Sequence, residues 1–289
     1  MIQEIYAKVL LNRVPQPDNW FGLRYNMNLY RGCQHQCIYC DSRSECYQIE
    51  DFSDVLVKVN AVELLKKELA SKRIKGTIGT GSMNDPYMPL EKQYNLTGQA
   101  LEVIHQFRFP VHIMTKSDLV LKDLETLQGI SEVYAAVSFS ITSADDDLGK
   151  QLEPGAPLVS ARYRAMETLA AHGILTGVVM MPVLPFLEDN VENITALVTK
   201  AHNSGAAYVI PSFGVSLRAG SRDYYYQVLD QRFPGVREQY QQRFGNMYHC
   251  AVNNADRLRE VFTELCDQFG LFTAIPQYTQ ESAKQLRLF

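Results

Sequence analysis

The sequence predicts an α/β fold: a partial (β/α)6 TIM-like barrel followed by a mostly helical C-terminal extension. Short apolar, strand-like runs alternate with amphipathic, helix-like runs, which is typical of a parallel sheet with helical crossovers. Six such units fall within about 190 residues, whereas a complete eight-unit barrel needs about 250. No internal repeat, low-complexity tract or linker divides the 289 residues, and the 46% hydrophobic and 21% charged content is that of an ordinary packed globule.

Each unit has its own signal in the sequence. The helices carry the spacing of an amphipathic helix, as in AVELLKKELASK at residues 61–72, and the helix at 159–172 is closed by Gly173. The strands are short apolar runs, such as PVHIMT at 110–115. In chain order, the expected strands are 25–30, 77–81, 110–115, 133–140, 174–181 and 207–211, and the expected helices are 61–72, 97–107, 119–127, 159–172 and 191–203. We therefore expect an N-terminal extension at 1–24, a barrel at 25–213 and a C-terminal segment at 214–289 that packs on the barrel.

Polar side chains follow the expected strands where each of them ends. Asn84 and Asp85 come after the second strand, Lys116 follows the third, and Ser138 and Ser140 close the fourth. Reactive groups in parallel α/β sheets gather at the C-terminal ends of the strands. The sequence therefore predicts a ligand-binding mouth at this end of the barrel.

Three cysteines follow the first expected strand. Cys33, Cys37 and Cys40 have a C-x3-C-x2-C spacing, and thiolates so close in sequence can all bind one small inorganic centre. Three thiolates leave one iron of a four-iron cluster open for chemistry, as catalytic zinc sites keep an open position. The alternatives are a structural zinc site completed by His35 or Cys46, and three unrelated thiols. The lack of a separate second cysteine pair argues against zinc.

Charge and cysteine content narrow the class of protein. The net charge is −4 and the pI is about 5.9, so no global positive field favours nucleic acid as a partner, although a local basic patch would escape this count. Six cysteines, three of them clustered, indicate metal ligation and not a disulfide framework. The first residues lack the pattern of a signal peptide, and the most apolar stretch, 174–187, is too short to span a membrane. We expect a cytoplasmic protein without a membrane partner.

The C-terminal segment interleaves arginines with tyrosines: Arg222, Tyr224, Tyr225, Tyr226, Arg232, Arg237, Tyr240, Arg243 and Tyr248. Such a pattern can hold stacked bases. Amphipathic helices that pack their tyrosines on the barrel explain it equally well, and we favour this interpretation. The remaining cysteines, Cys46, Cys250 and Cys266, are too scattered for a second cluster, and we expect inert or buried thiols. Cys250 would be a late hydrogen donor only if this segment folds over the barrel.

The cysteine motif does not stand alone. Together with Asp85-Pro-Tyr87-x-Pro-x-Glu91, Thr115-Lys116-Ser117 and Leu152-Glu-Pro154, it resembles the radical S-adenosylmethionine (radical SAM) superfamily, in particular its spore photoproduct lyase-like (DNA repair photolyase-like) branch. The resemblance covers residues 25–212. It implies a partial barrel of the radical SAM type and reductive cleavage of SAM at a [4Fe–4S] cluster. The resulting 5′-deoxyadenosyl radical would abstract hydrogen from a substrate that the sequence does not identify. The resemblance also implies an external one-electron reductant of the flavodoxin or ferredoxin type.

The resemblance assigns roles to individual residues. Cys33, Cys37 and Cys40 would ligate the cluster and leave the fourth iron to SAM. Lys116 would pair with the SAM carboxylate, a role that the charge of a lysine suits. The other implied contacts are Gly81, Ser82, Met83 and Asn84 near the methionine amino group, Ser138 and Ser140 at the ribose hydroxyls, and Tyr39 and Met181 beside the adenine.

The chain departs from the lyases at two positions. The lyases carry a cysteine hydrogen donor where this chain has Ser82, and a tyrosine after the third cluster cysteine where it has Asp41. A serine O–H bond is too strong to donate a hydrogen atom to a carbon radical. Two alternatives to an unidentified radical SAM reaction stay open: reversal of a DNA or RNA lesion, and a non-enzymatic iron–sulfur or zinc protein. The polar strand ends and Lys116 favour an enzyme.

Overall fold

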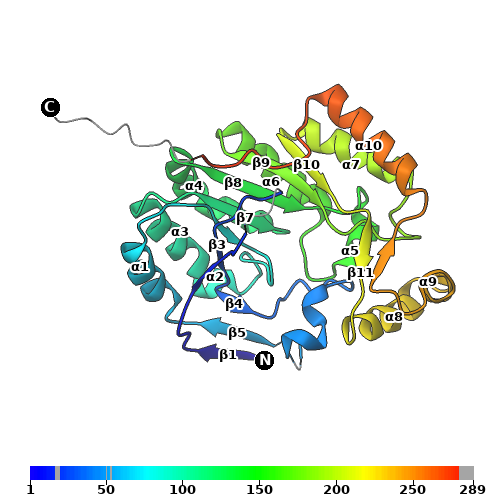
Figure 1. Ribbon diagram of the computed structural model, residues 1–289, viewed down its shortest axis with the longest axis horizontal. Coiled ribbons are helices and arrows are strands. Elements are labelled where there is room, and N and C mark those ends of the chain that lie inside the picture. Colours follow the sequence, from blue (N-terminus) through cyan, green and yellow to red (C-terminus); the bar gives the residue numbers. More distant parts are fainter. Residues whose placement is uncertain (17–19, 50, 53, 280–289) are drawn as a thin grey trace.

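A seven-stranded sheet forms the centre of the computed structural model (Figure 1), which describes residues 1–16, 20–49, 51–52 and 54–279. Its strands are β2 (Leu11–Arg13), β3 (Tyr25–Met27), β6 (Ile78–Thr80), β7 (Val111–Thr115), β8 (Ala135–Ser140), β9 (Leu175–Met180) and β10 (Tyr208–Pro211). They lie in the order β10-β9-β8-β7-β6-β3-β2, and every neighbouring pair is parallel except β2 with β3. The parallel strands of this sheet follow one another in chain order, which confirms the predicted partial barrel.

The central strands are covered on both faces. All six residues of β8 are buried, and five of the six residues of β9 are buried as well. Val111 of β7 pairs with Ile78 of β6 on one side and with Ala135 of β8 on the other. Continuous apolar strands of this kind are typical of parallel sheets that have both faces covered.

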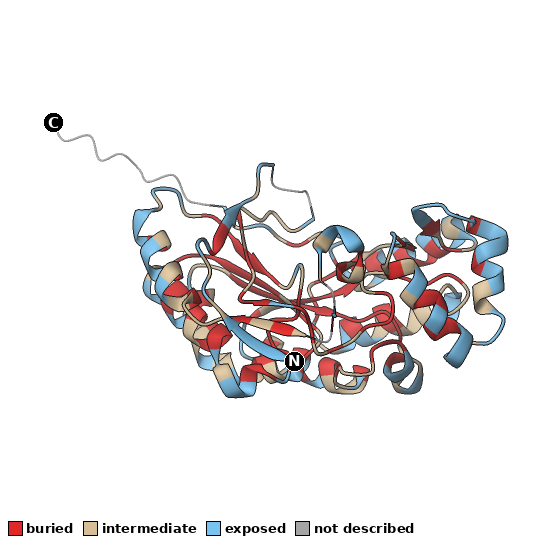
Figure 2. Cartoon of the chain, turned by 90° about the horizontal axis from the view of Figure 1, so that it is seen from below, coloured by how far each residue is buried: buried red, intermediate tan, exposed pale blue. Residues whose placement is uncertain are grey.

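Helices surround the sheet on its outer side (Figure 1). They are α1 (Ala61–Ser71), α2 (Glu91–Tyr94), α3 (Leu96–Gln106), α4 (Leu124–Ser131), α5 (Asp146–Leu152), α6 (Val159–Ala171) and α7 (Val191–Asn203). Figure 2 shows buried strands at the centre and helices whose outward faces are exposed. The helix expected at 119–127 is different: it begins as the 3-10 helix η3 (Asp118–Asp123), continues as α4 and ends later than predicted.

The first expected strand, 25–30, is split in two. β3 ends at Met27, and the chain then enters β4 (Tyr30–Arg31), which leaves the main sheet. β4 pairs antiparallel with β5 (Val55–Lys58), and β1 (Ile2–Ile5) pairs parallel with β5. The cysteine segment lies between β4 and β5, so this small three-stranded sheet holds both ends of that segment.

The C-terminal segment contains a two-stranded sheet in addition to the expected helices. β11 (Gly214–Ser216) pairs antiparallel with β12 (His249–Ala251), and α8 (Ser221–Arg232) and α9 (Val236–Phe244) lie between them in the chain. The last helix, α10 (Ala255–Phe269), packs against α7. In Figure 1, α8 and α9 lie beyond the edge of the barrel, next to this two-stranded sheet.

A second hydrophobic core joins the C-terminal helices to the cysteine segment. Tyr225, Tyr226 and Tyr240 are buried in it, together with Ile38 and Tyr39 of the cysteine segment. The tyrosines therefore pack as side chains of a core, as the sequence interpretation favoured over base stacking. No helix in the part of the chain that the structure describes is long and apolar enough to cross a bilayer.

Candidate active site

The cysteine segment leaves β4 through a turn that requires glycine. Gly32 has φ of 85°, and a Cβ at this position would lie 2.1 Å from the carbonyl oxygen of Asp54. Farther along, the Ile38 N–H donates to the Leu152 carbonyl at 2.9 Å, and the Gly155 N–H donates to the His35 carbonyl at 2.9 Å. The segment is therefore attached to the end of α5 and to the residues just after it, and its path is fixed at both ends and in the middle.

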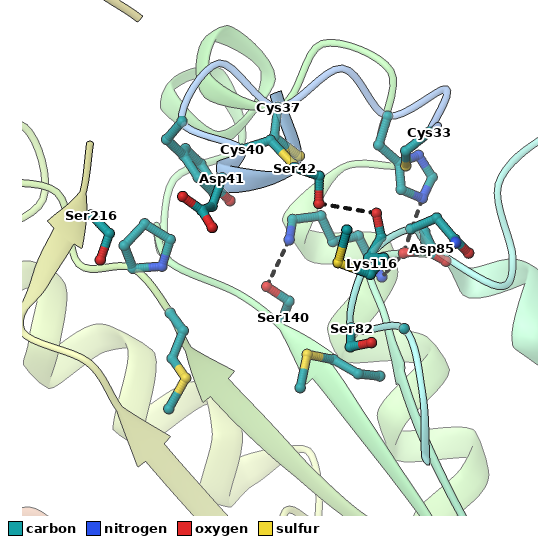
Figure 3. A pocket seen from close by; sticks show the side chains of 18 of the residues that line it. Cys33, Cys37, Cys40, Asp41, Ser42, Ser82, Asp85, Lys116, Ser140 and Ser216 are labelled. Atoms are coloured by element: carbon teal, nitrogen blue, oxygen red, sulfur yellow. Dashed lines mark hydrogen bonds and ion pairs between the residues drawn. The ribbon is translucent and has the colours of Figure 1, made fainter. Parts of the chain in front are cut away.

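The three thiols line a single cavity of about 350 Å³ at the C-terminal ends of the barrel strands (Figure 3). This volume lies within the range of about 300–1,000 Å³ that is usual for small-molecule sites. Cys33 and Cys37 are each 7% exposed. Burial raises the pKa of the Cys33 thiol to about 12, and burial also raises the pKa of Cys37. Thiols must lose their protons to bind metal, so metal binding here would be coupled to proton release.

Neither proposed fourth zinc ligand faces these thiols. His35 Nε2 lies 3.1 Å from Asp85 Oδ2, and its Nδ1 lies 3.2 Å from the Gly155 carbonyl. Cys46 is exposed and lies 3.5 Å from Arg218 Nη1. Among the described residues, no three His, Cys, Asp or Glu side chains are grouped closely enough to hold a single metal ion. A compact zinc site is therefore not preformed among the described residues.

The loop after β6 forms the opposite wall of the cavity. Gly81 has φ of 97°, and a Cβ there would lie 2.2 Å from the Met114 carbonyl oxygen, so only glycine fits. Asn84 Nδ2 donates to the Tyr30 carbonyl at 2.6 Å and ties this loop to the start of the cysteine segment. The Ser82 hydroxyl exchanges hydrogen bonds with the Asn26 side chain at 3.0–3.2 Å.

Asp85 holds three parts of the site together. Its carboxylate accepts from the Tyr87 N–H at 2.8 Å, from Thr115 Oγ1 at 2.7 Å and from the Lys116 N–H at 2.6 Å, in addition to its pairing with His35. Burial alone would raise the pKa of Asp85, but His35 and these hydrogen bonds lower it to about 2. Asp85 is therefore a positioning carboxylate that links the cysteine segment to the end of β7.

Lys116 extends from the end of β7 into the cavity. Its Nζ donates to Ser140 Oγ at 2.8 Å (Figure 3). The same nitrogen lies 3.6 Å from Glu153 Oε1. It also lies 5.8 Å from the ring centroid of Tyr39. Burial alone would lower the pKa of Lys116, but the Glu153 carboxylate and the Cys37 sulfur raise it, so the side chain stays charged. Among the described residues that line this cavity, Lys116 is the only lysine.

Glu153 connects Lys116 to a buried network behind the cavity. Its carboxylate accepts from the Tyr39 hydroxyl and pairs with Arg162 Nη2 at 2.5 Å. Arg162 is 1% exposed and also donates to the carbonyls of Ser140 and Pro157. This bond ties Tyr39 of the cysteine segment to a residue 114 positions away.

Ser138 does not reach the cavity, contrary to the prediction that it contacts a ribose. It is completely buried and bonds to His112 Nε2 at 2.8 Å and to the Tyr208 hydroxyl at 2.7 Å. Residues two apart on a strand share a face, but they differ in depth along the barrel. Ser140 lies at the end of β8 and lines the cavity, whereas Ser138 lies one step deeper in the barrel interior.

The cavity brings together the other predicted site residues: Cys33, Cys37, Tyr39, Cys40, Gly81, Ser82, Met83, Asn84, Lys116, Ser140 and Met181. Cys250 is not among the lining residues. It is buried in the second core, and its sulfur lies 3.9 Å from the Met247 carbonyl.

The profile described as the Radical SAM superfamily matches residues 27–198. This range is more than half of the chain and includes the three cysteines, Lys116 and Glu153. The chain belongs to the radical SAM superfamily. This radical SAM protein is an enzyme, so the non-enzymatic alternative is wrong, and family membership supports the use of SAM and an iron–sulfur cluster.

Several relatives share long stretches with this radical SAM enzyme. An uncharacterized protein of Mycobacterium tuberculosis is 28% identical over 277 residues, which are 93% of this chain and 81% of the relative. An uncharacterized protein of Methanocaldococcus jannaschii is 36% identical over 191 residues, which are 65% of this chain and 70% of the relative. The radical SAM Nalpha-GlyT isomerase of Pseudomonas phage M6 is 25% identical over 181 residues, or 63% of this chain and 37% of the relative.

Solved structures share the fold at lower identity. Spore photoproduct lyase complexed with dinucleoside spore photoproduct has a TM-score of 0.67 at 16% identity, over 93% of this chain and 79% of the lyase. The radical SAM methyltransferase TsrM of Kitasatospora setae, with cobalamin and a [4Fe–4S] cluster bound, has a TM-score of 0.54 at 13% identity, over 84% of this chain and 52% of TsrM. At identities this low, the structural similarity supports the fold of this radical SAM enzyme but does not identify its reaction.

Sequence reasoning missed one wall of this cavity. Ser216 ends β11, and Tyr248 directly precedes β12. Both line the cavity beside Asp41 and Tyr47. Arg218 links the two groups, because its Nε lies 3.3 Å from Asp41 Oδ1 and its Nη2 donates to the Tyr248 hydroxyl at 2.9 Å. The arginine–tyrosine pattern of the segment was the only signal, and it did not distinguish Tyr248 from the tyrosines of the second core.

Proposed function

We propose that this protein cleaves SAM reductively at a [4Fe–4S] cluster held by Cys33, Cys37 and Cys40. The 5′-deoxyadenosyl radical would abstract hydrogen from a substrate that enters the same cavity. One observation carries the proposal: the three thiols and the partly buried cation of Lys116 line a single cavity at the C-terminal ends of the strands. The donor set fits a cluster with one open iron, since three thiolates leave one iron of four without a protein ligand.

Lys116 suits the SAM carboxylate because it has a donor to spare. An ammonium group has three N–H donors. Ser140 accepts one of them at 2.8 Å, and Glu153 pairs with the ammonium group only as an ion pair at 3.6 Å. The ammonium group therefore has N–H donors that can meet an anion in the cavity. Arg162 is a poorer candidate, because its guanidinium is already engaged by Glu153 and by the carbonyls of Ser140 and Pro157.

The remaining lining residues suit the other parts of SAM. The Ser140 hydroxyl would hydrogen-bond the ribose, and the loop of Gly81, Ser82, Met83 and Asn84 would face the methionine amino group. Tyr39 and Met181 present apolar surface for the adenine. We infer that Glu153 and Asp85 act indirectly, because one fixes Tyr39 and Lys116 and the other fixes His35 and the backbone at Lys116. An external one-electron reductant of the flavodoxin or ferredoxin type would supply the electron.

Replacing Lys116 with alanine tests the assigned carboxylate site. SAM affinity should fall by about 2–5 kcal/mol, because removing one partner of a largely desolvated charge pair leaves the other unpaired. The affinity is measured by calorimetry on anaerobically reconstituted protein. Lys122→Ala is the matched control: Lys122 also pairs with carboxylates, at 3.3 Å from Glu91 and 3.1 Å from Asp123, but it does not line this cavity. Unchanged affinity in the Lys116 variant would show that the carboxylate binds elsewhere.

The second candidate function is lesion reversal of the spore photoproduct lyase kind, which is favoured by fold similarity over 93% of the chain. The cavity chemistry argues against it. Ser82 stands where the lyases have a thiol donor, and Asp41 stands in place of a tyrosine. Within the described residues, the cavity is lined by no cysteine other than the three cluster ligands.

We therefore expect no efficient repair of the spore photoproduct. The assay incubates a lesion-containing dinucleotide with SAM and dithionite and follows thymine release. A Ser82→Cys/Asp41→Tyr double variant supplies the two missing groups, and a gain of repair in that variant would support the reasoning. Turnover by the unchanged protein at a rate comparable to that of a known lyase would contradict it.

A further inference from the structure

We propose that Tyr248 is the hydrogen-atom donor of this pocket. Its phenol O–H would give a hydrogen atom to the carbon radical that remains on the substrate after the chemical step. The inference rests on the proposed function, because it needs a carbon radical in this cavity. Tyr248 directly precedes β12 and lies outside the range 27–198 that the family profile matches.

The pocket offers few groups that can donate a hydrogen atom. Its described lining holds no thiol besides the three proposed cluster ligands. Cys250 and Cys266 are buried outside the lining, and Cys46 is exposed outside it. Serine hydroxyls are present, but their O–H bonds are stronger than the C–H bond that would form. A phenol O–H bond is weaker than that C–H bond, so the tyrosines are the chemically competent O–H donors.

Three tyrosines line the pocket: Tyr39, Tyr47 and Tyr248. The Tyr39 hydroxyl is buried and donates to Glu153, and the Tyr47 hydroxyl donates to Asp41 Oδ2 at 3.3 Å. The Tyr248 hydroxyl instead accepts a hydrogen bond from Arg218 at 2.9 Å, and its side-chain hydrogen bond with Ser216, like that from Arg218, lowers its pKa. A guanidinium can only donate, so this bond uses an oxygen lone pair and leaves the phenol hydrogen available.

The position of Tyr248 suits a group that meets the substrate at the mouth. Tyr248 is 52% exposed. Its carbonyl accepts from the Leu217 N–H at 2.8 Å, which fixes its backbone beside the paired strands β11 and β12. Arg218 holds the phenol from one side and pairs with Asp41, the residue after Cys40. Tyr248 is therefore held between the β11–β12 sheet and the cysteine segment. Arg218 and Asp41 are positioning residues.

The proposed step balances as a transfer of one hydrogen atom. The O–H bond of Tyr248 breaks homolytically, a C–H bond forms on the substrate, and a neutral tyrosyl radical remains. One electron from the flavodoxin- or ferredoxin-type reductant and one proton from water restore the phenol. Arg218 keeps its hydrogen bond to the oxygen throughout, since that bond does not involve the transferred hydrogen.

The test uses SAM alone as the probe. The full chain with a reconstituted cluster is mixed with SAM and dithionite in deuterated water, free of added thiols, and the 5′-deoxyadenosine formed is analysed by mass spectrometry. Without another substrate, the adenosyl carbon radical takes hydrogen from a competent donor in the pocket. An exchanged phenol transfers deuterium, whereas a carbon-bound donor transfers protium. We expect singly deuterated product from the unchanged protein and loss of the label in Tyr248→Phe.

A matched variant and a spectroscopic measurement complete the test. Tyr47→Phe removes a phenol from the same rim and should keep the label. Freeze-quenched samples should show a tyrosyl EPR signal that narrows with ring-deuterated tyrosine and is missing in Tyr248→Phe. Unlabelled product from the unchanged protein, or a label retained in Tyr248→Phe, would overturn the assignment while leaving the proposed function intact. Formation of no 5′-deoxyadenosine at all would overturn both.

Discussion

Replacing Cys33, Cys37 or Cys40 with alanine should, in each case, remove the iron–sulfur cluster and all reductive cleavage of SAM. Three thiolates are the smallest set that leaves a single open iron, and two would leave half of the irons without a protein ligand. Iron and sulfide analysis with EPR should give about four irons per unchanged chain after anaerobic reconstitution and close to none in each variant. All three thiols line the same cavity, so no other lining thiol can replace a missing one.

Two other cysteines serve as controls for this prediction. Cys46 is exposed and Cys250 is buried in the second core, and neither lines the cavity, so Cys46→Ala and Cys250→Ala should keep the cluster. Urea unfolding of the cluster-free proteins separates ligand loss from misfolding, since losing one thiol there should cost no more than about 1 kcal/mol. One zinc per chain in protein made anaerobically with ample iron would contradict the cluster.

The elements of the barrel could be predicted because their signals are local. Apolar runs such as those of β7 and β9 are buried on both faces, and hydrophobic periodicity reports this burial directly. The polar residues at the strand ends could be predicted for the same reason, because topology places the C-terminal ends of parallel strands together. Lys116 and Ser140 lie within 2.8 Å of each other although 24 positions separate them.

Depth and long-range partners could not be predicted in this way. Ser138 and Ser140 have the same strand pattern, and only the curvature of the partial barrel decides that Ser138 bonds to Tyr208 while Ser140 lines the cavity. The Leu152-Glu-Pro154 motif carries no signal that Glu153 binds Tyr39 and Arg162. Tyr248 reaches the cavity because β11 and β12 pair. Both strands are short and carry no strong periodic signal in the sequence.

Glu153→Gln should lower the free energy of unfolding of the cluster-free protein by about 3–5 kcal/mol, because removing one charge of a buried ion pair leaves the other uncompensated. Glu153 and Arg162 are 2% and 1% exposed, and their charged groups lie 2.5 Å apart. The variant keeps the shape of the side chain, so urea unfolding reports the loss of charge. Glu132→Gln is the matched control: Glu132 is 67% exposed, lies 3.6 Å from Arg108, and should contribute less than about 1 kcal/mol.

The response of Glu153 to pH gives an independent check of the same network. Burial alone would raise the pKa of Glu153, but Arg162 and Lys116, with the Tyr39 hydroxyl, hold it below the ordinary value. A carboxyl whose pKa is lower in the folded than in the unfolded state contributes fully above the unfolded pKa, and this contribution disappears as the pH falls through the folded pKa. The unchanged protein should therefore lose stability on acidification below the ordinary range of a glutamate more steeply than Glu153→Gln does. Parallel curves of unfolding free energy against pH for the unchanged protein and Glu153→Gln would show that this carboxylate does not hold Arg162 and Lys116 by its charge. A stability loss in Glu153→Gln at neutral pH no larger than that in Glu132→Gln would show the same.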